Sequence, residues 1–86
     1  MRMYNVVLKK SAEKDLEKIN PVYYNSVISR IKGLSENPRP LGCVKLSVSK
    51  NAYRIRVGVY RIVYSIEDDI LVVEVIKIDH RRNVYR

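Results

Sequence analysis

The stretch YRIRVGVYRIVY, residues 53–64, decides the fold of this 86-residue chain. Apolar and polar side chains alternate on both sides of Gly58, and a period of two is typical of β-strands with one buried face. The glycine is suited to the turn that joins two such strands. The stretch therefore predicts a β-hairpin in which Ile55 faces a core while Arg54 and Arg56 face the other way.

Further strands are predicted on both sides of the hairpin. Residues 70–78 are nearly all apolar, as expected of a strand covered on both faces, and the acidic residues 67–69 form the turn that precedes it. Residues 44–48 alternate like the hairpin, and the apolar residues 4–8 form a short first strand. We expect this first strand to join the sheet beside a later one.

Two helices are predicted between the first strand and the others. Apolar residues recur every three or four positions over residues 12–19 and again over residues 24–34. Ser11 is a candidate N-cap for the first helix, and Asn20 for the second. The sequence thus predicts one α+β domain over residues 1–86. It consists of an N-terminal strand, a helical hairpin and a four-stranded antiparallel meander, with the helices packed on one face of the sheet.

The charge of the chain is strongly positive. Its 17 basic and 9 acidic residues give a formal net charge of +8, which indicates an anionic partner such as RNA, DNA, an acidic protein or a membrane surface. Seven of the ten basic residues within 39–86 are arginine, whose planar guanidinium matches the geometry of a phosphate. A basic surface that only keeps the protein soluble is the alternative.

Several classes of function lack the residues that they need. The single Cys43 cannot form an internal disulfide, and a lone thiol fits a reducing compartment, so we expect a cytoplasmic protein. One Cys and one His do not make a four-ligand zinc site, and the acidic residues 67–69 are expected to form a solvated turn. We therefore predict no metal and no cofactor. No stretch approaches the roughly 20 apolar residues of a membrane helix, and we expect no membrane partner.

The hairpin carries the first candidate site. Alternation places Arg54, Arg56 and Arg61 on one outer face of the sheet, where three guanidinium groups repel one another unless an anion binds among them. A polynucleotide backbone is such an anion. An antiparallel sheet with one solvated face also needs polar residues there, so a purely structural interpretation stays open at this point.

The segment DHRRNVYR, residues 79–86, strengthens the functional interpretation. It follows the apolar strand directly and holds the one histidine of the chain, three arginines and a tyrosine. His80 is titratable near neutral pH, and Tyr85 is able to stack on a base or donate a hydrogen bond to a phosphate. A basic terminus that only packs on the sheet is the alternative.

The strings YRIRVGVYRIVY (residues 53–64) and VIKIDHRRNVY (residues 75–85), preceded by Lys45-Leu46, together resemble the RelE family of bacterial and archaeal toxin–antitoxin systems. The resemblance extends over nearly the whole chain. It implies a type II toxin that a cognate antitoxin inhibits in a hetero-oligomer. It also implies a ribosome-dependent endonuclease that cuts messenger RNA in the A site. In that reaction the RNA 2′-hydroxyl attacks the adjacent phosphate, and no metal takes part.

The resemblance also implies roles for individual residues. Arg54 and Arg56 stand where the family has basic residues that hold the RNA backbone and assist proton transfer. Arg61 matches the arginine that stabilises charge on the phosphorane. Arg81 matches an arginine that assists the leaving 5′-oxygen, and Tyr85 matches a tyrosine that orients the nucleophile or stacks on a base. Further contacts to RNA are expected from Lys45, His80 and Arg82.

Two points stay open at the level of sequence. Some family members have lysine where this chain has Arg54 and Arg56, and arginine effectively cannot give up its proton. The general base is therefore open: His80 or Tyr85 takes part in proton transfer, or Arg54 and Arg56 act mainly by electrostatics. The function also has alternatives. A ParE-like binding module that inhibits DNA gyrase without cutting RNA shares the fold, and so does a relative that has lost its toxicity.

Overall fold

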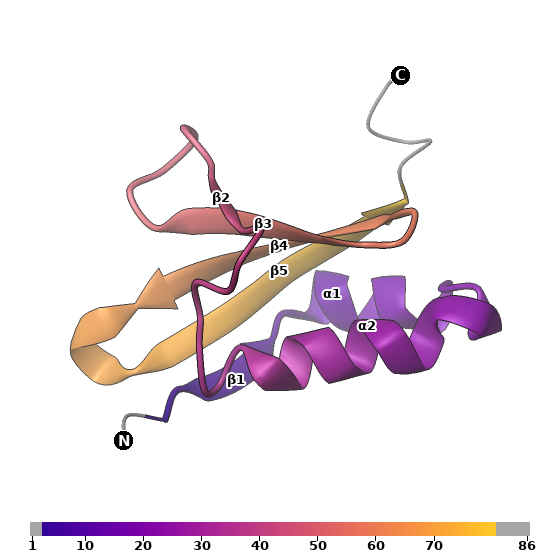
Figure 1. Cartoon of the computed structure of the whole chain (residues 1–86), viewed down its shortest axis with the longest axis horizontal. Coiled ribbons are helices and arrows are strands. Elements are labelled where there is room, and N and C mark those ends of the chain that lie inside the picture. Colours follow the sequence, from indigo (N-terminus) through magenta and orange to yellow (C-terminus); the bar gives the residue numbers. More distant parts are fainter. Residues whose placement is uncertain (1–2, 81–86) are drawn as a thin grey trace.

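The computed structural model describes residues 3–80, which form one β-sheet with two helices against one of its faces (Figure 1). The predicted α+β architecture is confirmed. In chain order, its elements are β1 (Asn5–Leu8), α1 (Lys10–Glu17), α2 (Pro21–Gly33), β2 (Val44–Lys45), β3 (Ala52–Val57), β4 (Tyr60–Glu67), the short 3-10 helix η1 (Asp68–Ile70) and β5 (Val72–His80). No helix within these residues is long and apolar enough to cross a membrane.

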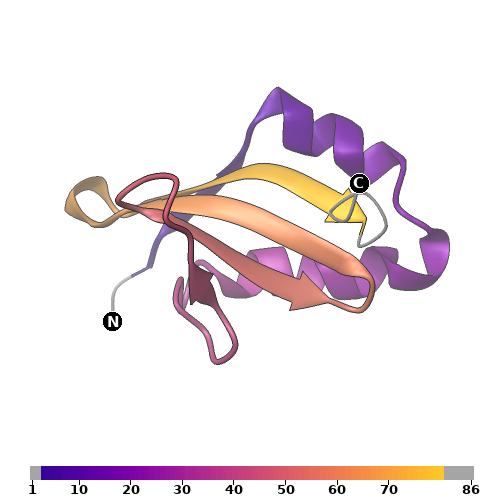
Figure 2. The ribbon, with the colours of Figure 1, turned by 90° about the horizontal axis from the view of Figure 1, so that it is seen from above.

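The strands lie in the order β1-β5-β4-β3-β2, and Figure 2 shows this sheet from above. From β2 to β5 each strand pairs antiparallel with the next, as the predicted meander requires. The strand β1 pairs with β5 in parallel, with Asn5 opposite Val72 and Leu8 opposite Val75. The helical hairpin makes this possible, because a parallel pair needs a long crossover connection.

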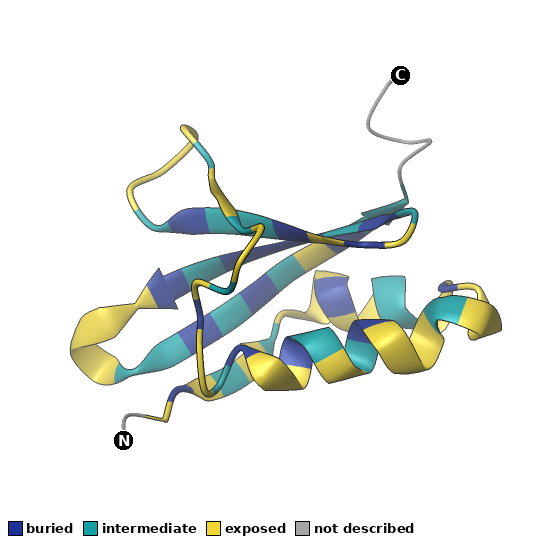
Figure 3. Ribbon diagram, viewed as in Figure 1, coloured by how far each residue is buried: buried dark blue, intermediate teal, exposed yellow. Residues whose placement is uncertain are grey.

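The core lies between the sheet and the helices, and burial alternates along the strands (Figure 3). On the sheet side, Ile55 and Ile62 are completely buried, and Ala12 and Val27 are completely buried on α1 and α2. The predicted alternation of the hairpin is therefore confirmed. Its consequence for function is that the side chains next to Ile55 and Ile62 in sequence lie on the face of the sheet that bears no helix.

The helix α1 protects an open strand edge. The strand β5 continues past the end of β1, which pairs only with its first four residues. The Ser11 hydroxyl donates to the Ile76 carbonyl at 2.6 Å, and the Ile78 amide donates to the Asp15 carboxylate at 2.9 Å. These side chains take the place of a neighbouring strand and satisfy backbone groups that would otherwise be unpaired.

The two helix starts differ in how well the sequence predicted them. Asn20 caps α2 as predicted, since its side chain accepts from the Val22 amide at 3.0 Å. The predicted cap at Ser11 is wrong, because α1 begins at Lys10 after an N-cap at Lys9 that makes no side-chain bond. The hydroxyl of Ser11 is used at the β5 edge, which sequence periodicity does not indicate.

The segment before the hairpin forms less strand than the alternation predicted. Only Val44–Lys45 pairs with β3, and a loop of turns follows. Val44 is 41% exposed and Val48 is 84% exposed, while Leu46 is half-buried. Because β2 is only two residues long and lies at the edge of the sheet, the alternating side chains that follow it have no core to pack against.

The loop after α2 is fastened to the sheet by hydrogen bonds. The buried Tyr64 hydroxyl donates to the Pro38 carbonyl at 2.7 Å. The Arg39 guanidinium binds the Asp68 carboxylate, with 2.8 Å between Nη2 and Oδ2, and the Tyr4 hydroxyl donates to the same carboxylate at 2.6 Å. The acidic turn before β5 thus joins the loop to the residue that precedes β1.

Candidate nucleic-acid interface

Three arginines lie together on the helix-free side of the sheet. Arg56 on β3 is directly opposite Arg61 on β4, and Arg54 lies two residues earlier on β3. Their sequence neighbours Ile55 and Ile62 point into the core and are fully buried. We call this surface of the sheet, with Arg54, Arg56 and Arg61, the arginine face.

Two of these arginines have no charged partner in the described part of the chain. Within residues 3–80, neither Arg54 nor Arg56 makes an ion pair or a side-chain hydrogen bond to another residue. A guanidinium group carries five N–H donors in a planar fork. Both groups therefore present their donors and their charge to whatever meets the arginine face.

Arg61 differs from the other two because it has a carboxylate neighbour. Asp79 lies opposite it on β5, with 3.5 Å between Arg61 Nη2 and Asp79 Oδ2. Lys77 also approaches that oxygen, at 3.3 Å from its Nζ. The arginine face thus contains an anion of its own between two cations, which alternation along β3 and β4 alone did not show.

The environment of Arg61 is partly closed. Its side chain is 26% exposed, and its Nε atom is buried without a hydrogen-bond partner among residues 3–80. Buried N–H groups nearly always have a partner in folded proteins. Because Nε is buried, it is not itself open to a ligand, but the long contact between Nη2 and Asp79 leaves Nη2 able to donate a shorter bond to an anion such as a phosphate oxygen.

His80 lies on the opposite side of the sheet from the arginines. It pairs with Tyr60, a core residue, and the two rings meet edge to face at 5.2 Å. Both line a cavity of about 230 Å³ beside the end of α1, together with Asp15, Lys18, Ile78 and Asp79. The predicted RNA contact of His80 stays a prediction, and the structure does not bring it to the arginine face.

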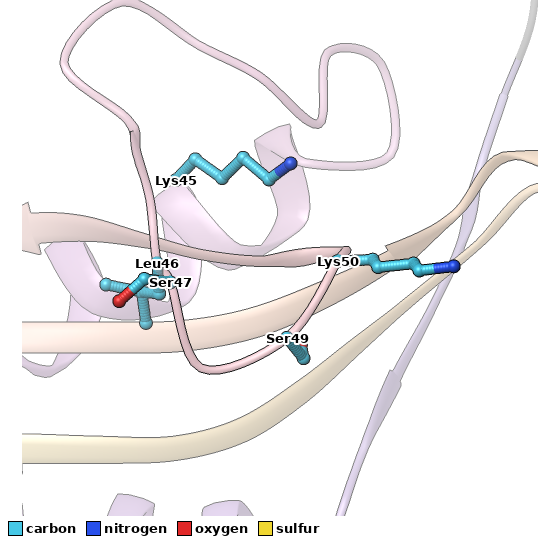
Figure 4. Close-up of a pocket in the computed structure, with 5 residues that line it drawn as sticks. All are labelled: Lys45, Leu46, Ser47, Ser49 and Lys50. Carbon is cyan, nitrogen blue, oxygen red and sulfur yellow. The ribbon is translucent and has the colours of Figure 1, made fainter.

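Lys45 is also separated from the arginines. It pairs with Tyr53, whose ring stacks on the buried Tyr64, so its register position is on the helix-facing side of the sheet edge. Lys45 is the last residue of β2, and it lines an open hollow of about 500 Å³ with Lys50 and residues of the loop between them (Figure 4). Its RNA contact stays a prediction. Arg81, Arg82 and Tyr85 lie outside the described residues.

Sequence reasoning missed the two charged side chains that β5 adds to the arginine face. Lys77 and Asp79 are two residues apart on one strand, so they share a face. The two-residue spacing is visible in the sequence. It does not show that Lys77 and Asp79 share a face with the arginines until the pairing of β5 with β4 is known. Within the described part of the chain, no three Asp, Glu, His or Cys side chains are grouped to hold a metal ion.

Comparisons with known proteins agree on one family. The model of the ParE toxin family of type II toxin–antitoxin systems matches residues 6–85. Toxin RelG of Mycobacterium tuberculosis is 31% identical over 84 residues, a match that covers 96% of this chain and 97% of that protein.

Solved structures share the fold along nearly the whole chain. In the toxin–antitoxin complex RelBE2 from Mycobacterium tuberculosis, one chain is 30% identical with a TM-score of 0.81, covering 94% of both chains. In the archaeal RelE–RelB complex from Pyrococcus horikoshii OT3, one chain is 26% identical with a TM-score of 0.82, covering 92% of this chain and 96% of that one. The chain described here therefore belongs to the ParE toxin family of type II toxin–antitoxin systems and is a RelE-type toxin of the RelE/ParE superfamily.

Proposed function

We propose that this toxin is a ribosome-dependent, metal-independent endoribonuclease that cuts messenger RNA in the ribosomal A site and so halts translation in the cytoplasm. The observation that carries the proposal is the arginine face, where Arg54 and Arg56 make no ion pair among residues 3–80 and Arg61 makes only a long contact to Asp79. An RNA backbone supplies one anion per nucleotide. The similarity to RelE toxins supports the same function.

The proposed reaction uses the RNA as its own nucleophile. The 2′-oxygen loses its proton and bonds to the adjacent phosphorus, while the bond from phosphorus to the 5′-oxygen breaks and that oxygen takes up a proton. Negative charge grows on the non-bridging oxygens during this attack. Arg61 is proposed to stabilise that charge, and a single fixed donor of this kind typically lowers the barrier by about 3–4 kcal/mol.

The residues named in this proposal stabilise charge and position the RNA, and none of the arginines is the base. Arg54 and Arg56 hold the backbone and do not act as bases, because arginine stays protonated. Arg81 is proposed to assist the leaving 5′-oxygen, and Tyr85 to orient the nucleophile. The ribosome supplies much of the in-line geometry, and geometric alignment alone is worth many orders of magnitude in rate. A domain of this size is therefore sufficient for the chemistry.

A cognate antitoxin is the proposed protein partner. The solved relatives in the RelBE2 and archaeal RelE–RelB structures are toxin–antitoxin complexes. We infer that the antitoxin of this toxin covers the arginine face with acidic side chains, because complementary charge selects the partner and speeds its association. A co-expressed partner that leaves Arg54 and Arg56 accessible would contradict this part of the proposal.

The experiment that tests the nuclease function is cell-free translation with purified toxin. Wild-type protein is expected to stop synthesis and to leave mRNA cut at the A site, as mapped by primer extension. Arg61→Ala and Arg81→Ala are each expected to reduce the cleavage rate about 100- to 1000-fold. Full activity in both variants would show that the site is wrong, and intact mRNA with wild-type toxin would show that the function is wrong.

The relatives and solved structures are RelE-type toxins and do not favour the ParE-like alternative. The name of the family model is the reason to test it. The matching family model is named for ParE toxins, and the ParE-like alternative is a binding module that inhibits DNA gyrase. A supercoiling assay separates the two. Gyrase inhibition by the wild-type toxin together with unimpaired translation would establish the alternative, and normal supercoiling with cut mRNA would exclude it. Induction that leaves growth unaffected would instead indicate a relative without toxicity.

A further inference from the structure

The arginine face contains a carboxylate in register with its arginines. Arg56, Arg61 and Asp79 form one transverse row across β3, β4 and β5. Lys77 lies on the same side of β5 as Asp79. The Asp79 carboxylate therefore contacts two cations, Arg61 and Lys77. Two like charges directly across a strand pair repel each other, and Arg61 has such a neighbour in Arg56. The electrostatic environment of Arg61 therefore depends on Asp79.

The contacts of Asp79 are of the kind that an incoming phosphate replaces. Its Oδ2 atom lies 3.5 Å from Arg61 Nη2 and 3.3 Å from Lys77 Nζ. Both distances exceed the roughly 2.7–2.9 Å of a strong charge-assisted hydrogen bond. The side chain of Asp79 is 25% exposed, so its charge is screened less than that of a surface residue. The carboxylate is thus close enough to orient the guanidinium and loosely enough bound to be displaced.

We propose that Asp79 is a positioning residue for Arg61. In the RNA-free toxin it offsets the repulsion among Arg56, Arg61 and Lys77 and holds the Arg61 guanidinium over the arginine face. When RNA binds, a phosphate oxygen takes over the donors of Arg61 with shorter bonds. This inference rests on the proposed nuclease function, because it assigns Asp79 a part in preparing the group that stabilises the phosphorane.

A positioning role has opposite effects on binding and on rate. The charge of Asp79 repels phosphate, so removing it strengthens the attraction of RNA to the arginine face. The same change leaves Arg61 without the group that orients it, and a displaced catalytic group costs rate even when the substrate binds well. A residue that merely stabilises the fold would lower both quantities together.

The test compares three variants of the full chain. Asp79→Asn removes the charge and keeps the shape, and Asp79→Glu keeps the charge. Glu13→Gln makes the same change in net charge on α1, which packs on the opposite side of the sheet. Affinity is measured on ribosomes whose A-site codon carries 2′-deoxynucleotides, so that no cleavage occurs. Cleavage is measured in a single turnover on the matching all-RNA message at saturating toxin.

The expected result is a split between the two measurements. Asp79→Asn binds about threefold more tightly, with a salt dependence steeper by about 0.7, the contribution of one further contact to single-stranded phosphate. Its single-turnover rate falls about tenfold. Asp79→Glu keeps most of the rate, and Glu13→Gln equals the wild type in both measurements.

Four other results would overturn the inference or the proposed function. An Asp79→Asn variant with wild-type rate and affinity overturns the inference and leaves the nuclease function intact. Loss of rate together with loss of affinity and a lowered melting temperature overturns it in favour of a structural role. If Asp79→Asn does not fold, an Asp79→Glu variant that folds but cuts no better than Arg61→Ala overturns it. Failure of the wild type itself to cut overturns the proposed function.

Discussion

Arg56 and Arg61 lie directly opposite each other on β3 and β4, so the structure places two positive charges in register at its surface. A like-charged cross-strand pair destabilises a hairpin by roughly 0.2–1 kcal/mol. Many other side chains at these two positions would give a more stable sheet. Under the proposed function, RNA phosphate that binds between the two guanidinium groups would offset this cost in stability.

Replacing one member of this pair is expected to separate stability from binding. Arg56→Gln should raise the free energy of unfolding by a few tenths of a kcal/mol and weaken ribosome binding, with a salt dependence shallower by about 0.7. Urea unfolding and salt-dependent binding measure the two effects. Lys14→Gln on α1 is the matched control and should change neither; equal effects of both variants on binding would contradict a localised interface.

The turn of the hairpin gives a prediction about backbone strain. Gly58 has a φ of +58°, and a Cβ atom there would lie 2.5 Å from the Tyr23 ring. Gly58→Ala is therefore expected to cost roughly 2 kcal/mol, from the left-handed backbone and the collision together. Chemical denaturation measures the loss.

A second glycine separates these two causes. Gly42 also has a positive φ, of +92°, but an added Cβ meets nothing within 4 Å. Gly42→Ala should therefore cost only the backbone contribution, roughly 1 kcal/mol. The double variant Gly58→Ala with Tyr23→Ala should lose less stability than the two single changes added together. Equal losses for the two glycines would show that Tyr23 moves aside freely.

Tyr64 makes the stability of the fold sensitive to alkaline pH. Burial, reinforced by interaction with Cys43, raises the pKa of the Tyr64 phenol well above its usual value of 10. Above pH 10 the unfolded chain loses this proton while the folded chain keeps it. The free energy of unfolding therefore falls as pH rises, by up to about 1.4 kcal/mol per pH unit for this group.

Tyr64→Phe removes that alkaline loss. The variant is expected to be less stable than the wild type by about 1–2 kcal/mol at pH 7, because the Pro38 carbonyl loses its donor. The difference should shrink between pH 10 and pH 11. Denaturant unfolding at a series of pH values measures it, and the exposed Tyr24→Phe is the control, for which the difference from wild type should stay constant with pH.

The edge of β5 beyond β1 depends on Asp15. Asp15→Ala removes the acceptor of the Ile78 amide and is expected to cost about 1–2 kcal/mol, with faster hydrogen exchange at that amide. Asp15→Asn keeps an acceptor oxygen and should retain most of the protection. Unchanged exchange in Asp15→Ala would mean that another group satisfies the amide.

The arrangement of strands and helices was accessible from local patterns in the sequence. The alternation around Gly58, the helical spacing before it and the Asn20 cap all describe interactions between residues close in the chain. The strand predicted over residues 44–48 is too long, because alternation does not indicate whether the apolar side chains have a core to pack against. Ser11 misled for a related reason, since its partner Ile76 is 65 residues away.

The sequence predicts the part of the candidate site that lies within the hairpin, but not the residues that other strands bring to it. The hairpin arginines share a face because strand geometry alternates, and the turn at Gly58 sets their register. The family resemblance groups His80 and Lys45 with them as RNA contacts, yet the pairings with Tyr60 and Tyr53 place both on the other side of the sheet. Asp79 and Lys77 join the arginines only through the pairing of β4 with β5. Such pairings between strands are properties of the folded chain.

The order in which the sheet is assembled also has a consequence for the cell that makes this protein. The strand β5 is the last of the described strands to be synthesised, yet it lies between β1 and β4. Until it has emerged, β1 has no neighbour and the row from Arg56 through Arg61 to Asp79 is incomplete. Folding must therefore wait for contacts between distant parts of the chain. A growing chain would not present a finished arginine face to the ribosome that is still translating it.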